Sequence, residues 1–252
     1  MRRRWPGDGD GRRAAQLSDE VAREWGLDLG EAFALSRHSL VAPAGDGAVL
    51  KIVPPEDDES TEEADALALW NGDGAVRLLQ HDPARRALLL ERALPGDDLS
   101  RLPEDAATAV LVDVARRLWR PAGEPFRWIG DHVPRWLASA PGVLGARARE
   151  LYAGLDVGDT LLVHGDLHHQ NVLHSDRGWL AIDPKPMRGE REYDVPSVLW
   201  NPLPCRLRTE HLEERLDAFA AAGLDEERMR LWTVIRGSYL QPQEAEALLR
   251  LV

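Results

Sequence analysis

Cysteine and long apolar runs are nearly absent from this sequence. Its 252 residues include one cysteine, Cys205, which cannot form a disulfide within the chain, so a disulfide-stapled fold is excluded. No apolar run approaches the roughly 20 residues that cross a bilayer. The basic start, Arg2 to Arg4, is not followed by the hydrophobic stretch of a secretory signal. We therefore expect a cytoplasmic protein that does not enter a membrane.

Basic side chains are outnumbered by acidic ones. The chain has 31 Lys and Arg against 43 Asp and Glu, a formal net charge of −12. Proteins that bind nucleic acid gain affinity by neutralising phosphates, so a nucleic-acid binder is not expected. The acidic surplus is compatible with a cationic small substrate, and equally with a role in solubility alone. The length suits one large domain or two closely packed lobes.

Polar side chains gather after the short apolar run 161–163. Asp166 precedes Asn171 by five positions there, and a second apolar run, 179–182, ends at Asp183. Two carboxylates and a carboxamide therefore converge from one hairpin. Phosphoryl transfer needs this set, because one carboxylate orients a hydroxyl and accepts its proton while carboxylate and amide oxygens hold Mg²⁺.

The spacing of these residues is that of a known catalytic loop. Asp-x-x-x-x-Asn matches protein kinases, with 164–166 replacing His-Arg-Asp and 183–185 replacing Asp-Phe-Gly. Together with Gly189, Tyr193-Asp194 and Asn201-Pro202, the hairpin resembles the aminoglycoside phosphotransferase group of the kinase-like superfamily. It is most similar to the streptomycin 6-phosphotransferase and hydroxyurea kinase branch.

This resemblance implies an α+β fold of two lobes that bind ATP and Mg²⁺ between them. Residues 1–92 would form a small nucleotide-binding lobe with a five-stranded antiparallel sheet and a helix, and residues 93–252 a larger, mostly helical lobe that binds the acceptor. The local patterns indicate strands at 32–35, 48–53, 76–81 and 87–92, turns at 36–39 and 45–47, and helices at 18–25, 64–70 and 104–119. Residues 1–16 lack a periodic apolar pattern, and Ser18 is expected to cap the first helix.

Lys51 is a single charge within an apolar strand, which is costly unless the ammonium is paired. A solvent-facing lysine on an edge strand is the alternative from the strand alone. The resemblance implies that Lys51 binds the phosphates of the nucleotide. It also implies that Glu63 forms an ion pair with Lys51, with Glu62 as the alternative partner.

The resemblance also assigns nucleotide contacts that leave no clear side-chain pattern. The turn from Ser36 to Ser39 would lie over the phosphates, although it contains no glycine. The backbone at Glu91 and Ala93 would hydrogen-bond the adenine edge.

In the large lobe the resemblance makes Asp166 the catalytic residue that faces the acceptor hydroxyl. Asn171 and Asp183 would hold Mg²⁺. Glu190 is expected to face either a cationic acceptor or water. The acceptor itself would be a small hydroxylated molecule, with streptomycin and its 6-hydroxyl as the first candidate and hydroxyurea or an amino sugar as alternatives. We expect a monomer or a weak dimer.

Three further residues are expected to support the loop: His164, His168 and Asp194. A different class of enzyme is also conceivable, because His164, Asp166 and His168 could ligate zinc in a hydrolase. That interpretation leaves Lys51 and Asp183 without a shared purpose. A kinase-shaped protein without turnover is the other rival, but such a protein is expected to lose at least one of its catalytic residues.

Overall fold

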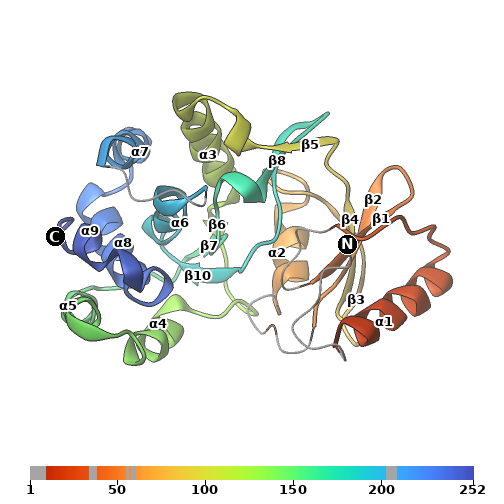
Figure 1. The fold of residues 1–252 in the computed structure, drawn as a ribbon, viewed down its shortest axis with the longest axis horizontal. Coiled ribbons are helices and arrows are strands. Elements are labelled where there is room, and N and C mark those ends of the chain that lie inside the picture. Colours follow the sequence, from red (N-terminus) through yellow and green to blue (C-terminus); the bar gives the residue numbers. More distant parts are fainter. Residues whose placement is uncertain (1–9, 34–38, 55–56, 58–60, 203–208) are drawn as a thin grey trace.

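The computed structural model describes residues 10–33, 39–54, 57, 61–202 and 209–252. Figure 1 shows a sheet-rich lobe built from the first part of the chain beside a mostly helical lobe built from the rest. The C-terminus lies at the far end of the helical lobe.

The small lobe contains one antiparallel sheet. Its order is β1-β2-β4-β3, made of β1 (Leu40–Ala44), β2 (Ala48–Ile52), β4 (Ala87–Glu91) and β3 (Leu78–Asp82). The prediction of five strands was wrong for the part of the chain that is described. Residues 32 and 33 form no strand there, because the Phe33 side chain is 43% exposed and only its backbone amide bonds to this sheet, at Val41. Residues 34 and 35 lie outside the described residues.

Helix α1 (Asp10–Trp25) is longer than the sequence predicted. Ser18, expected as its cap, is a buried residue inside the helix. The helix extends back because the stripe that contains Val21 continues to Ala14, which is also buried, and the polar sequence around it concealed this. The stripe packs on the sheet at Leu50 and neighbouring apolar residues. Figure 1 shows α1 beside the sheet of the small lobe.

Strand β2 divides its side chains between two helices. Leu50 and Ile52 join the cluster with α1, and Lys51, which points to the opposite face, pairs with Glu63 at the start of α2 (Glu63–Trp70). Trp70 at the end of α2 donates its indole N–H to the Leu118 carbonyl of the large lobe at 2.8 Å.

The large lobe surrounds two small sheets with helices. Their strand orders are β5-β8-β9 and β10-β7-β6. The strands are β5 (Pro95–Asp98), β6 (Arg120–Pro121), β7 (Leu161–Val163), β8 (Val172–Ser175), β9 (Gly178–Ala181) and β10 (Met187–Gly189). The helices are α3 (Glu104–Leu118), α4 (Ile129–Ala138), α5 (Gly142–Ala153), α6 (Val195–Trp200), α7 (Thr209–Ala221), α8 (Glu226–Leu240) and α9 (Ala245–Leu249), with short 3₁₀ turns η1 (Leu99–Arg101), η2 (His169–Asn171), η3 (Arg191–Tyr193) and η4 (Pro242–Glu244).

One apolar cluster crosses the boundary between the lobes. It includes Leu67 and Leu90 of the small lobe together with Leu111 and Leu180 of the large lobe, all buried. The cluster fixes the hairpin of β8 and β9 against the sheet that carries Lys51. In the described part of the chain, no helix combines the length and apolar character that a membrane span requires.

Candidate active site

Three charged groups from distant parts of the chain meet between the lobes. The Lys51 ammonium lies 2.7 and 2.6 Å from the two oxygens of Glu63, and 2.6 Å from Oδ1 of Asp183. Lys51 comes from β2, Glu63 from α2 and Asp183 from the segment after β9. Of the two expected glutamates, Glu63 therefore pairs with Lys51, while Glu62 pairs with Arg127.

Burial and mutual attraction set the charges of this cluster. Burial acts to lower the pKa of Lys51, but Glu63 and Asp183 outweigh it and raise the pKa. Burial raises the pKa of Glu63, although Lys51 opposes it. Burial also acts to raise the pKa of Asp183, but the ammonium groups of Lys51 and Lys185 lower it to about 2. Asp183 is therefore ionised at neutral pH.

The loop between β7 and η2 is held by Asp194. Its carboxylate accepts the backbone amide of His164 at 3.0 Å and that of Gly165 at 2.7 Å. It also accepts the indole N–H of Trp119 at 2.9 Å. Two loop amides that would otherwise be buried without partners are thereby satisfied.

His164 fixes the same loop from inside. Its Nδ1 accepts the Asp166 amide at 3.2 Å, and its Nε2 faces the Ile182 carbonyl at 3.1 Å. The ring stacks on Trp70, with centroids 6.2 Å apart. Burial lowers the pKa of His164, so the ring is neutral and its proton lies on Nε2.

Asp166 and Asn171 lie side by side. The Asn171 amide donates to the Asp166 carbonyl at 2.9 Å and approaches its carboxylate oxygen at 3.4 Å. His168 Nε2 is 3.6 Å from the same carboxylate, and its Nδ1 accepts the Gln170 amide. Burial acts to raise the pKa of Asp166, but His168 and more distant cations lower it below its ordinary value. Asp166 is thus a carboxylate at neutral pH.

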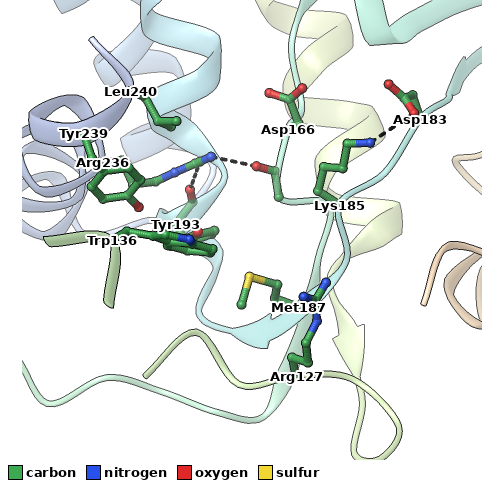
Figure 2. Close-up of a pocket in the computed structure, with 11 residues that line it drawn as sticks. Arg127, Trp136, Asp166, Asp183, Lys185, Met187, Tyr193, Arg236, Tyr239 and Leu240 are labelled. Carbon is green, nitrogen blue, oxygen red and sulfur yellow. Dashed lines mark hydrogen bonds and ion pairs between the residues drawn. The ribbon is translucent and has the colours of Figure 1, made fainter. Parts of the chain in front are cut away.

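A cavity of about 280 Å³ opens beside Asp166 and Asp183 (Figure 2). Its walls combine basic and aromatic side chains, and Asp166 and Asp183 are its acidic groups. The basic and aromatic residues that line it are Arg127, Lys185, Arg236, Trp136, Tyr193 and Tyr239.

Arg236 was not predicted from the sequence, yet it contacts the loop that contains Asp166. Its guanidinium donates to the carbonyls of Gly165 and Tyr193, both at 2.7 Å, and lies over the Tyr193 ring at 4.4 Å (Figure 2). The signal that could have found it was the same as for Lys51: a charged residue within the buried stretch of α8 that contains Val234 and Ile235.

Glu190 does not reach this cavity. Its carboxylate accepts two N–H groups of Arg228, at 3.0 and 2.6 Å, the Gly158 amide at 3.0 Å and the indole N–H of Trp232. The expectation that Glu190 faces an acceptor or water is therefore corrected, because its charge is neutralised within the lobe.

Three of the four small-lobe residues expected near the adenine and the phosphates, Glu91, Ala93 and Ser39, belong to the described part of the chain. Glu91 ends β4, and its side chain forms a two-point ion pair with Arg177, at 2.8 and 2.6 Å. Ala93 follows it and is buried. Ser39 is buried next to β1, and Ser36 lies outside the described residues.

The zinc alternative does not fit this geometry. Both ring nitrogens of His164 face backbone groups of the loop. Among the residues whose positions are described, no three His, Cys, Asp or Glu side chains are grouped so as to hold a metal ion.

Comparison with known proteins agrees with the resemblance seen in the sequence. Residues 31–241 match the family model described as aminoglycoside/hydroxyurea antibiotic resistance kinase. The chain is 37% identical to a hydroxyurea phosphotransferase of Kitasatospora aureofaciens over 240 residues, 86% of this chain and 69% of that protein. It is 34% identical to a streptomycin 6-kinase of Streptomyces glaucescens over 242 residues, 86% of this chain and 78% of that protein.

The fold is also found among solved structures. An ADP-bound crystal structure of the aminoglycoside phosphotransferase APH(2'')-Ib superimposes with a TM-score of 0.56 at 13% identity, covering 94% of this chain and 96% of that one. The expected kinase-like, two-lobed α+β fold is thereby confirmed.

Proposed function

The chain belongs to the family of aminoglycoside/hydroxyurea antibiotic resistance kinases, and from this premise we propose that it moves the γ-phosphoryl group of ATP to a hydroxyl of a small molecule. The observation that carries this proposal is the convergence of Lys51, Glu63 and Asp183 beside the loop that contains Asp166 and Asn171. Since ATP is a cytoplasmic metabolite, we place the reaction in the cytoplasm, with the protein acting as a monomer or weak dimer.

We assign nucleotide binding to the small lobe, with its boundary after residue 92. Lys51 would contact the α- and β-phosphates, and Glu63 would keep the ammonium in position through its two-oxygen contact. The backbone at Glu91 and Ala93 would bind the adenine edge. The fold shared with an ADP-bound phosphotransferase supports the use of a nucleotide.

Asn171 and Asp183 fit a magnesium ion. The Asn171 N–H donates to the Asp166 carbonyl, which leaves the amide oxygen at the other end of the group for ligation. Asp183 is ionised, and amide and carboxylate oxygens are ligands that Mg²⁺ prefers. When bound, the ion would neutralise charge on the phosphate oxygens.

Asp166 is the group that faces the acceptor. As a carboxylate held by the loop, it accepts a hydrogen bond from the incoming hydroxyl and aligns the oxygen with the γ-phosphorus. It takes up the hydroxyl proton as the new oxygen–phosphorus bond forms and the bond from the γ-phosphorus to the departing ADP breaks. Asp194 and His164 contribute by fixing the loop backbone, so the catalytic effect is mainly one of positioning.

The first acceptor to consider is a streptomycin-type aminoglycoside, phosphorylated at its 6-hydroxyl, with antibiotic resistance as the consequence. This assignment comes from the streptomycin 6-kinase among the relatives. Hydroxyurea is the second candidate, and a specific observation favours it. The cavity is at the small end of the range for ligand sites and carries Arg127, Lys185 and Arg236, whereas the guanidinium groups of streptomycin call for additional carboxylates.

The test is an ATP-consumption screen over aminoglycosides, hydroxyurea and amino sugars, with mass spectrometry to detect the phosphate adduct. We expect Asp166→Ala to reduce turnover of the active acceptor by about 10³-fold or more, the scale of a lost catalytic group. Affinity for MgADP should stay within a few-fold, because Asp166 does not contact the nucleotide in this assignment. Full turnover in Asp166→Ala, or no adduct with any acceptor in the wild type, would contradict the proposal.

A further inference from the structure

The chain contains only two lysines, and both lie at one carboxylate oxygen. Of its 31 basic residues 29 are arginine, and the lysines are Lys51 and Lys185. The Lys51 ammonium is 2.6 Å from Oδ1 of Asp183, and the Lys185 ammonium is 3.5 Å from the same atom. Everywhere else in the chain the basic side chain is a guanidinium.

The two lysines differ in burial and in their relation to the cavity. Lys51 belongs to β2, is almost fully buried and does not line the cavity. Lys185 lies two residues after Asp183, lines the cavity together with Asp166, and has a side chain that is 16% exposed. Figure 2 shows its ammonium directed towards Asp183, at the end of the cavity where Asp166 also lies.

Two ion pairs of the Lys185 ammonium, with Asp183 and Asp57, are longer than those of Lys51. It is 3.5 Å from Asp183 and 3.5 Å from Asp57, whereas Lys51 is held at 2.6 and 2.7 Å by its carboxylate partners. A bound phosphoryl group would offer the Lys185 ammonium a further anionic partner on the cavity side. Lysine suits such a role because its charge is compact and its three donors rotate, while the arginine fork requires a planar, two-point partner.

We propose that Lys185 is a catalytic residue that contacts the transferring phosphoryl group from the acceptor side. This inference rests on the proposed function. Charge in phosphoryl transfer is spread over the three equatorial oxygens of the moving group. Lys51 serves the donor phosphates, and Lys185 binds one of those equatorial oxygens as the group passes towards the hydroxyl aligned by Asp166.

The backbone and the side chain of Lys185 have separable roles. Its amide donates to the His164 carbonyl at 2.8 Å, which joins the segment after β9 to the catalytic loop. A substitution of the side chain keeps this hydrogen bond. Lys185→Met preserves most of the aliphatic length, and Lys185→Arg restores a positive charge with a different shape.

The first test compares nucleotide binding with binding of a transition-state mimic. For Lys185→Met we expect kcat to fall about 10²-fold to 10³-fold, the scale of one lost electrostatic contact. The Kd for MgADP should change less than about threefold, while affinity for MgADP with aluminium fluoride should fall in step with kcat. Lys185→Arg should recover part of both. Arg101→Met, which removes an exposed cation paired with Asp97, is the matched control and should match the wild type.

The second test uses the scarcity of lysine. An ATP acyl phosphate, activated at the γ-phosphate, transfers its acyl group to a nearby amine, and peptide mass spectrometry then identifies the modified lysine. We expect acylation of Lys185 as well as Lys51, with excess MgATP protecting both. Acylation of Lys51 alone, or a Lys185→Met protein with normal kcat and normal affinity for the fluoride complex, overturns the role of Lys185 but leaves the proposed function intact. Absence of acylation at both lysines overturns both.

Discussion

At the scale of single residues, His169 is a buried imidazole with an unusual environment. It is 2% exposed, and neither ring nitrogen has a hydrogen-bond partner among the described residues. Burial, assisted by the nearby Arg215, lowers the pKa of His169 to about 4. In the unfolded chain the pKa returns to about 6.5. The unfolded state therefore binds the extra proton first as the pH falls.

We predict that this difference makes the protein less stable in mild acid. Between about pH 6.5 and pH 4 the free energy of unfolding should fall by roughly 1.4 kcal/mol per pH unit from this group, up to about 3 kcal/mol, and above pH 7 the effect should vanish. Urea unfolding at pH 7.0, 6.0 and 5.0, in EDTA, measures it. His169→Leu should show a clearly shallower pH dependence than the wild type. If the unfolding free energy of His169→Leu depends on pH as steeply as that of the wild type, other groups cause the loss of stability in acid.

Single residues also show where sequence-based reasoning stops. Lys51 was predictable because an ammonium in an apolar strand requires a partner, and the spacing from Asp166 to Asn171 required no tertiary information. Glu190 was misjudged because its three partners, Arg228, Gly158 and Trp232, come from segments that only the fold brings together. Arg236 stands out as a charge within an apolar stretch, but its acceptors, the carbonyl oxygens of Gly165 and Tyr193, could not be identified from the sequence.

At the scale of elements, the conformation of the loop that contains Asp166 depends on a glycine. Gly165 has a positive φ of 81°, and a Cβ there would lie 2.0 Å from the Lys185 carbonyl oxygen. No rotation of a side chain can relieve a contact with backbone. The loop and the segment after β9 must therefore separate if the residue is enlarged, which would also move Asp166.

We predict that Gly165→Ala lowers both stability and activity. Gly178→Ala is the matched control, because Gly178 has a similar φ of 95° but an added Cβ there would meet no described atom within 4 Å. The control should cost about 1 kcal/mol from backbone conformation alone. Gly165→Ala should cost clearly more and reduce kcat at least tenfold. Thermal unfolding measures the loss of stability, and steady-state kinetics measures kcat. Equal losses of stability and of kcat in the two variants would refute the steric argument.

The elements themselves were predictable to different degrees. Strands β2 and β4 and helix α3 follow the predicted apolar patterns closely. The start of α1 was missed because charged and glycine-rich sequence hid the continuation of its buried stripe. The small strands β6 and β10 are too short for any periodic pattern, and they exist because β7 offers both edges for pairing.

At the scale of the whole molecule, the two lobes share one core. The cluster that joins Leu67 and Leu90 to Leu111 and Leu180 is continuous, and polar contacts across the boundary accompany it, including the pair of Glu91 with Arg177. Neither lobe can lose its structure without exposing apolar surface of the other.

We predict one cooperative unfolding transition. Calorimetry should give a van't Hoff enthalpy equal to the calorimetric enthalpy, and far-UV and near-UV circular dichroism should share one midpoint. Residues 1–92 expressed alone should show no cooperative transition, because their buried face lacks its partner. Two resolved transitions in the intact chain would contradict this view of the core.

Because side chains alternate along β2, the register of this strand decides whether Lys51 faces α2 and the site or the apolar cluster with α1. Leu50 and Ile52 face α1 while Lys51 faces α2. A slip of a single position relative to β1 or β4 would bury an amine in hydrocarbon and present a methyl group to the triphosphate. Insertions or deletions at 45–47, the connection between β1 and β2, that shift this register would thus abolish phosphorylation although they change no residue of the site.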